Sequence, residues 1–532
     1  MKNALYPLLM LALLLGACGT GADSAADDDD NDDASPAGDD DNDDDNDNDD
    51  NDDDTAPPAL EWVSCNEFYP LEYRVLIPPD TACGTVAAPV DWENDDGRRL
   101  AVRFAVVPAA DAAATDVLAV HLGGPDPNLR NVILLGLWPE GFLNVELREN
   151  FTLLFVESRG SSLSSTPLVC PDDVLGRPYA DPDEYRALVR ECLEGLPTDV
   201  SPARLSTAAA ARDFARVRAA LGLDTIKLYG NSYGTRLFLE YLRLDDAHVA
   251  AYLFDSLLAP QGTGRHDLDR ILKTLAADCD AVADCPYSSG AALWAATDEF
   301  INGPAAAGAP TGREITMDLF HLGDEPRFLA RWPMVLAAGA ADDWAAMKAW
   351  HQEALILREP PTELGTDGET LVFDPYSDNT MCLDFPGWNV FSDTTFVLSQ
   401  LSPPYIPLDQ IEWMTAIDCE ELARLDDAPP QVDRTPVATA LPGLLIAPRL
   451  DQATPWTGAA QAVAAGLSGG YVVPVNADHA VLFDLGGRES GVPLADQQCL
   501  RQLAVDWLRE PFDPFSRPCV QTLAAPLPIE NW

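Results

Sequence analysis

The chain has 532 residues, of which 47% are hydrophobic, and a formal net charge of −54 at pH 7. A chain of this length can bury a large apolar core and exceeds the size of one ordinary domain. Nineteen aspartates and no basic residue lie between Gly21 and Thr55, and the rest of the chain is also strongly acidic. This charge argues against nucleic-acid binding and against docking on anionic lipid.

The N-terminus, residues 1–18, resembles a bacterial lipoprotein signal peptide. Lys2 precedes an apolar run, Leu5–Leu15, that is too short to span a bilayer as a mature helix. The run ends in a lipobox-like Leu-Gly-Ala-Cys, which predicts lipidation of Cys18; an ordinary signal peptide is the alternative. Gly19 then favours outer-membrane sorting in a Gram-negative host. We expect an exported lipoprotein of the cell envelope, with the lipid as its only membrane anchor.

Ten cysteines remain after Cys18, and an even number in an exported protein predicts disulfides. The sequence leaves their connectivity open, but pairing of near neighbours is the most economical scheme. That scheme joins Cys65–Cys83, Cys170–Cys192, Cys279–Cys285, Cys382–Cys419 and Cys499–Cys519. A metal site is not expected, because no Cys-x-x-Cys pair occurs and the six histidines are scattered.

Four regions follow the signal peptide. Residues 19–57 form an Asp-rich segment that has little to bury and repels itself, which predicts a disordered linker. Short apolar segments then alternate with helical patterns, as is typical of a mostly parallel sheet covered on both faces. The expected strands are Val86–Trp92 and Leu100–Val107 as an antiparallel pair, then Asp116–His121, Leu153–Val156, Thr225–Tyr229, Ala250–Asp255, Gly443–Ala447 and Gly470–Val475. Residues 262–437 have helical spacing and predict a lid, inserted between core parts 58–261 and 438–532.

The strongest motif is Gly-Asn-Ser232-Tyr-Gly, which follows a β-branched strand and precedes an amphipathic helix. Such a turn strains the serine backbone and exposes its hydroxyl, so Ser232 is the predicted nucleophile. The backbone N–H of Tyr233 would lie at a helix N-terminus, where it can stabilise an oxyanion. The loop that begins at His121 contains two glycines, and we expect the N–H of Gly124 to be the second oxyanion donor. We expect His121 to shape this loop.

A nucleophilic serine needs a base and an acid that orients the base, in the chain order serine, acid, histidine. His479 is the one histidine that comes just after a final strand, so it is the predicted base. Asp451 follows the strand Gly443–Ala447, whereas Asp478 adjoins His479. Because adjacent side chains do not naturally pair, Asp451 is the preferred acid.

Together these residues resemble the tripeptidyl-aminopeptidase and proline-iminopeptidase branch of the α/β hydrolases, from about Cys83 to Cys519. The segments that carry the resemblance are Cys83–Trp92, Gly123–Pro125, Glu157–Ser164, Ser206–Thr235, Met381–Asp384, Asp451–Pro455 and His479. The resemblance implies an α/β-hydrolase fold, a helical lid and release of residues or short peptides from free N-termini, without metal or cofactor. Asp126 departs from the family, which usually has glycine there, and it puts a carboxylate near the acyl pocket.

Enzymes of this type hold the substrate ammonium with carboxylates near the lid. The resemblance points to Asp384, with Asp126 beside the oxyanion loop as a second substrate-binding candidate and with Asp324 and Glu325 as weaker ones. Alternatively, Asp384 braces the lid beside Cys382. We expect a serine exopeptidase acting on a peptide or small acyl substrate. A carboxylic-ester hydrolase and a non-catalytic surface-binding lipoprotein are the alternatives, and the oligomeric state stays open.

Overall fold

The computed structural model describes residues 59–171, 173–174, 177–196, 200–260, 268–304, 306–322, 326–357, 369–370, 375–384, 408–425, 433–454, 456–482 and 494–523. The predictions for Cys18 and for the linker at 19–57 lie outside these residues, as do Asp324 and Glu325. The chain divides into two units, Met1–Ala56 and Pro57–Trp532, and the described residues belong to the second. Among the described residues, none of the helices has the length and apolar character that crossing a membrane requires.

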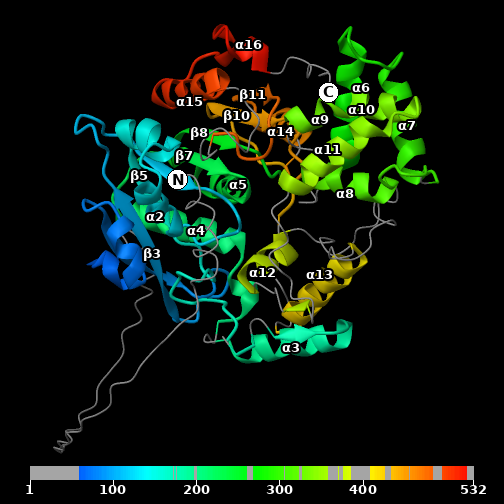
Figure 1. Ribbon diagram of the computed structural model, residues 1–532. Helices are drawn as coiled ribbons and strands as arrows, with labels where there is room; N and C mark the ends of the chain where they lie inside the picture. Colours follow the sequence, from blue (N-terminus) through cyan, green and yellow to red (C-terminus); the bar gives the residue numbers. More distant parts are fainter. Residues whose placement is uncertain are drawn as a thin grey trace, which may run out of the picture. The chain divides into compact units, whose positions relative to one another are not determined.

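A nine-stranded sheet in the order β1-β2-β3-β5-β4-β7-β8-β10-β11 lies at the centre (Figure 1). Its strands are β1 (Leu60–Val63), β2 (Ala82–Pro89), β3 (Arg99–Val107), β4 (Val117–His121), β5 (Thr152–Val156), β7 (Ile226–Asn231), β8 (Val249–Asp255), β10 (Gly443–Pro448) and β11 (Gly470–Val475). From β5 to β11 every neighbouring pair is parallel, and β2 and β3 are the expected antiparallel pair. All residues of β7 and β10 are buried, as expected for strands covered on both faces. The predicted mostly parallel sheet is confirmed.

Two hydrophobic clusters cover the two faces of the sheet, because successive side chains of a strand point to opposite sides. Leu118 and Leu153 pack in the cluster that includes α2, α15 and α16, whereas Ala119 and Leu154 pack in the cluster that includes α4, α5 and α14. These helices are α2 (Arg130–Leu137), α4 (Thr207–Ala220), α5 (Tyr233–Asp245), α14 (Trp456–Ala465), α15 (Leu494–Arg509) and α16 (Val520–Leu523). The helices thus form layers on both faces.

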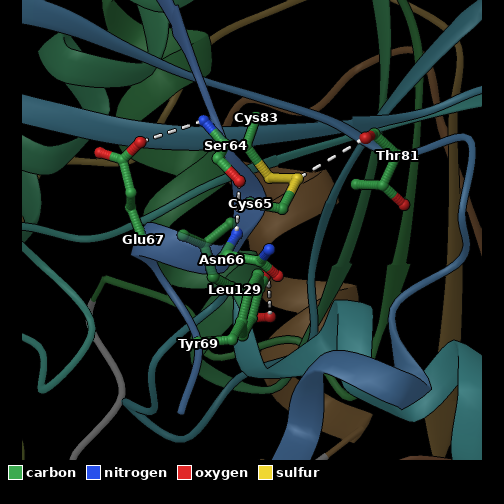
Figure 2. The surroundings of a disulfide bond; sticks show 8 residues. All are labelled: Ser64, Cys65, Asn66, Glu67, Tyr69, Thr81, Cys83 and Leu129. Atoms are coloured by element: carbon green, nitrogen blue, oxygen red, sulfur yellow. Dashed lines mark hydrogen bonds between the residues drawn. A yellow bond between two sulfur atoms is a disulfide. The ribbon is translucent and has the colours of Figure 1, made fainter. Parts of the chain in front are cut away.

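The edge strand β1 was not predicted, since its four residues are too few for a clear pattern and two of them are exposed. A disulfide between Cys65 and Cys83 ties the chain after β1 to β2 (Figure 2). Nearby, the Tyr69 hydroxyl donates to the Leu129 carbonyl at 3.0 Å. The N-terminal segment therefore supports the start of α2.

Most of the described residues between β8 and β10 lie in helices, in the interval where the sequence predicts a lid, and we call these helices the lid. They are α6 (Leu268–Ala281), α7 (Gly290–Asn302), α8 (Gly312–Leu322), α9 (Pro326–Leu329), α10 (Trp332–Ala340), α11 (Trp344–Leu357), α12 (Pro375–Asp384) and α13 (Leu408–Ala423). Helices α6 to α11 share a hydrophobic cluster in which Phe328 stacks on Trp350 at 3.9 Å between ring centroids. Leu450, the neighbour of Asp451, belongs to the same cluster. The lid thus packs on the segment that carries the predicted catalytic acid.

One partner of the lid comes from outside the predicted boundary of 262–437. Helix α3 (Pro182–Glu194), which lies between β5 and β7 in sequence, packs against α13 (Figure 1). Tyr185 on α3 donates to Asp418 at 2.9 Å, and Arg186 pairs with Glu421 at 2.6 Å. A two-residue strand, β9 (Glu369–Thr370), also pairs antiparallel with β6 (Pro178–Tyr179). Residues on the two sides of the nucleophile therefore build this part of the lid together.

Ten cysteines are joined in the five pairs of the near-neighbour scheme. Cys382–Cys419 links α12 to α13, and Cys170–Cys192 holds the segment before α3 to that helix. These two bonds stabilise the part of the lid built from α3, α12 and α13.

Candidate active site

Ser232 occupies the sharp turn between β7 and α5. Its backbone has φ 50° and ψ −124°, in a region that serine rarely adopts and that costs roughly 1–3 kcal/mol. The flanking glycines permit the turn: a Cβ on Gly234 would lie 2.0 Å from the His121 carbonyl oxygen, and one on Gly230 would lie 3.0 Å from the backbone of Gly234. The turn presents the serine at the carboxyl end of β7, where sites of parallel sheets form.

Asp451 and His479, the predicted acid and base, lie in contact with each other. The Asp451 carboxylate is buried, and its Oδ2 lies 2.8 Å from His479 Nδ1. Its Oδ1 accepts the N–H groups of Ala453 at 2.8 Å and Thr454 at 2.7 Å, and the Thr454 hydroxyl donates to Oδ2. Because Nδ1 faces the carboxylate, the neutral imidazole carries its proton there and leaves Nε2 as the basic nitrogen.

Acids surround the imidazole of His479. Burial alone would lower the pKa of His479, but the charge and hydrogen bond of Asp451, followed by the charges of Asp478 and Asp255, raise that pKa from 6.5 to about 9. Burial would raise the pKa of Asp451, yet attraction to His479 and hydrogen bonds from His479 and Thr454 lower it below 3.8. Asp478 accepts the backbone N–H of His479, whereas Asp451 is bonded to Nδ1 of the ring.

The serine and the histidine lie on neighbouring loops but do not touch through a hydrogen bond. Within the residues that the structure describes, neither ring nitrogen of His479 is hydrogen-bonded to the hydroxyl of Ser232. Catalytic hydrogen bonds of this kind are often long until a substrate is bound. The two loops are instead joined through Asp255, whose carbonyl accepts the Ser232 N–H at 3.0 Å.

The glycine loop after β4 lies directly on the nucleophile. A Cβ on Gly123 would lie 2.9 Å from Ser232 Cβ and 3.4 Å from the Tyr233 nitrogen. The Gly123 N–H donates to His121 Nδ1 at 3.2 Å, whereas the Gly124 N–H has no acceptor among the described residues. Tyr233 begins α5, so its N–H has no acceptor within the helix. The two expected oxyanion donors, Gly124 and Tyr233, are therefore both available.

His121 and Glu157 hold this glycine loop in shape. Burial lowers the pKa of His121 from 6.5 to about 3, so its ring stays neutral and accepts the Gly123 N–H. Glu157, which sequence reasoning did not single out, is buried and accepts the N–H groups of Asn128 at 3.0 Å and Leu129 at 2.9 Å. The first residues of the resembling Glu157–Ser164 segment thus support the loop rather than the reaction.

The two predicted substrate-binding acids differ in exposure. Asp384 at the end of α12 is buried; its Oδ2 accepts from the Thr207 hydroxyl at 2.6 Å and lies 3.7 Å from Arg236 Nε. Its Oδ1 has no hydrogen-bond partner among the described residues. The Asp126 side chain is 60% exposed and lies 3.4 Å from Arg130. Asp384 thus joins the end of α12 to α4 and α5, and Asp126 faces solvent beside the glycine loop.

This arrangement has the parts that acyl transfer needs: a strained serine, a basic nitrogen held by a buried carboxylate, and two N–H donors beside the serine. Thr454 was visible in the sequence as part of a motif, but its hydroxyl contact with Asp451 was not predicted. Among the described residues no cluster of three or more His, Cys, Asp or Glu side chains has the arrangement of a metal site.

Comparison with known proteins agrees with this geometry. Residues 120–302 match the family model described as the alpha/beta hydrolase fold. The chain is 27% identical over 254 residues to serine protease Hip1 of Mycobacterium tuberculosis, covering 43% of this chain and 47% of that protein. It is 27% identical over 281 residues to Carboxylesterase B of Mycobacterium tuberculosis, covering 48% and 53%.

A tripeptidyl aminopeptidase of Streptomyces coelicolor is 27% identical over 221 residues, covering 38% of this chain and 38% of that protein. The matches to Hip1 and Carboxylesterase B thus span about half the length of those relatives. The chain has the alpha/beta hydrolase fold, with a mostly parallel sheet and a nucleophile turn, and the model of that fold matches residues 120–302.

Proposed function

We propose that the protein is a serine hydrolase that works through an acyl-enzyme. Ser232 attacks a substrate carbonyl, and His479 takes the serine proton and returns it to the leaving group. Asp451 holds the imidazole, while the N–H groups of Tyr233 and Gly124 bind the oxyanion. Water then attacks the acyl-enzyme with His479 again as base. The 2.8 Å contact between Asp451 and His479, beside the strained Ser232, carries this proposal.

The proposed substrate is the free N-terminal end of a peptide, from which single residues or short peptides are released. Two of the relatives are a serine protease and a tripeptidyl aminopeptidase, which supports a peptide substrate. The substrate ammonium needs a carboxylate partner within reach of the acyl pocket. Asp126 suits this role because its side chain is exposed beside the glycine loop, whereas Asp384 is buried.

Paired substrates test this function. Peptidyl amides with a free N-terminus should be cleaved, and the same amides with an acetylated N-terminus should not. Ser232→Ala should lower the rate on the free amide by a factor on the order of 10⁶. Asp126→Asn should raise the KM for free-amine substrates about tenfold and leave blocked acyl esters unaffected, with Asp384→Asn as the comparison. Equal cleavage of free and acetylated amides would refute the exopeptidase proposal.

A carboxylic-ester hydrolase is the second candidate, favoured by the similarity to Carboxylesterase B. The same catalytic residues serve both reactions, so the fold does not distinguish them. This candidate predicts fast hydrolysis of simple acyl esters and none of peptidyl amides. A non-catalytic binding protein would react with neither, and a fluorophosphonate probe would then fail to label Ser232.

We also propose that the enzyme is anchored in the bacterial cell envelope by a lipid on Cys18. The lipobox-like residues before Cys18 and the acidic segment after it support an anchor followed by a spacer. Metabolic labelling with a palmitate analogue should mark the wild-type protein and not the Cys18→Ser variant. Labelling of both proteins would refute the anchor.

A further inference from the structure

The dipeptide Asp255-Ser256 lies where three strands of the site end. It closes β8, between β7 and β10 in the sheet. The Asp255 carbonyl accepts the Ser232 N–H at 3.0 Å, and the Ser256 N–H donates to the Ile446 carbonyl at 3.1 Å. The backbone of these two residues is therefore tied to the nucleophile turn on one side and to β10, which leads to the catalytic acid, on the other.

The side chains of the same dipeptide reach the histidine loop. Asp255 Oδ2 accepts the Leu482 N–H at 2.7 Å, and the Ser256 hydroxyl accepts the Ala480 N–H at 2.9 Å. The Ser256 hydroxyl also donates to Asp255 Oδ1 at 3.3 Å. The residue that follows His479 is thus held from the serine side of the site, as is the residue two positions further on.

The backbone at both ends of this contact is strained. Ser256 has φ 59° and Ala480 has φ 63°, in the left-handed region that residues with a side chain rarely adopt. Such conformations persist only where surrounding contacts hold them, and they gather at functional sites. The N–H of strained Ala480 is bonded to the hydroxyl of strained Ser256, so the two conformations depend on each other.

We propose that Asp255 and Ser256 are positioning residues that hold the His479 loop against the Ser232 turn, and that the charge of Asp255 acts on His479. The proposal rests on the proposed serine-hydrolase function. Neither residue touches the substrate; each acts through the backbone of residues that flank His479. Their contacts matter because the serine and the histidine sit on separate loops, and a shift of about 1 Å between them can cost 100-fold in rate.

The second part of the proposal is that the charge of Asp255 affects the pKa of His479. Burial raises the pKa of Asp255 from 3.8 to about 6, although the Leu482 N–H and the charge of His479 both lower it. The acids that face His479 are Asp451, Asp478 and Asp255. Asp255 also faces Asp451 and the buried hydroxyl of Tyr229. Loss of the Asp255 charge should therefore lower the pKa of His479.

Three variants separate the hydrogen bonds that hold the His479 loop from the effect of the Asp255 charge on His479. Asp255→Ala removes both the acceptor for Leu482 and the charge, and Asp255→Asn keeps an acceptor oxygen but loses the charge. Ser256→Ala removes the acceptor for Ala480 and the hydroxyl that donates to Asp255, and it keeps the charge of Asp255. We expect kcat/KM to fall at least tenfold in Asp255→Ala, with KM changed less than twofold, and to recover in Asp255→Asn. The part of the pH profile in which kcat/KM rises with pH, its acid limb, should move to lower pH in Asp255→Asn. It should stay in place in Ser256→Ala, although this variant should lose activity severalfold.

Two activity-independent measurements accompany the kinetics. Hydrogen exchange should show faster exchange at Ala480 in Ser256→Ala and at Leu482 in Asp255→Ala, and NMR titration of the His479 ring should show a lower pKa in Asp255→Asn. Wild-type rates and unchanged exchange in the two alanine variants would overturn the proposal, as would an unmoved His479 pKa in Asp255→Asn. Failure of wild-type protein to react with a fluorophosphonate would instead refute the hydrolase function, while exchange and titration would still test the contacts.

Discussion

The raised pKa of His479 makes the pH dependence of catalysis a sharp test of the site. A pKa of about 9 against an ordinary 6.5 corresponds to roughly 3 kcal/mol in favour of the charged imidazolium. A base must be neutral to accept the serine proton, so only about one molecule in a hundred is competent at pH 7. We expect kcat/KM to rise about tenfold per pH unit below pH 9 and to level off above it.

Removing the charge of an acid beside His479 should shift the acid limb of the kcat/KM profile in a known direction. Asp478 is one of the acids that raise the pKa of His479, so Asp478→Asn should lower that pKa and move the limb to lower pH. Its amide oxygen can still accept the His479 N–H, which keeps the loop contact. The matched control is Asp111→Asn, an exposed residue that precedes β4 and so lies at the opposite end of that strand from the glycine loop.

The assay is kcat/KM of an acyl ester without a free amine, which has no group of its own that titrates between about pH 5 and 10, for wild type and both variants. The rate of fluorophosphonate labelling at Ser232 gives the same profile without turnover. A wild-type midpoint below pH 7 would refute the assignment of Asp451, Asp478 and Asp255 as charges acting on His479. If the acid limb of the kcat/KM profile moves as far in Asp111→Asn as in Asp478→Asn, the shift does not arise from acids beside His479.

Three further predictions follow from single contacts. Thr454→Val removes the hydroxyl that donates to the catalytic acid, so kcat/KM should fall roughly tenfold with KM unchanged, and an unaltered rate would count against this contact. Arg159→Leu leaves Asp213 buried without its cation, 2.7 Å away in the native protein, and should cost about 3–5 kcal/mol in denaturant unfolding; a loss under 1 kcal/mol would contradict the pair. Replacing Cys382 and Cys419 together by serine should lower the free energy of unfolding by about 2–4 kcal/mol in the same assay, and wild-type stability would disprove a bond that constrains the lid.

Local sequence determined the parts of the site that depend on short-range geometry. The turn at Ser232 follows from two glycines around one serine, since any side chain at Gly234 would collide with the backbone of His121. The strands before Ser232 and Asp451 were visible as short, largely apolar runs, because both are buried at every position. The strand before His479 was visible as a short run too, although it is only partly buried. The chain order serine, acid, histidine then selected the pair that lies at 2.8 Å.

Tertiary structure alone decided which distant residues support those parts. Tyr185 and Asp418, 233 residues apart, join α3 to the lid, and no periodic pattern links helices so far apart in the chain. Asp384 carries the same charge as an exposed acid, but packing buries it against Thr207 of α4 and Arg236 of α5. Ser256 and Ala480 lie 224 residues apart, and their bond forms because β8, β10 and β11 are consecutive strands in the sheet. Short-range sterics and hydrophobic periodicity are written in consecutive residues, whereas burial and long-range hydrogen bonds arise only when the whole sheet and lid have packed.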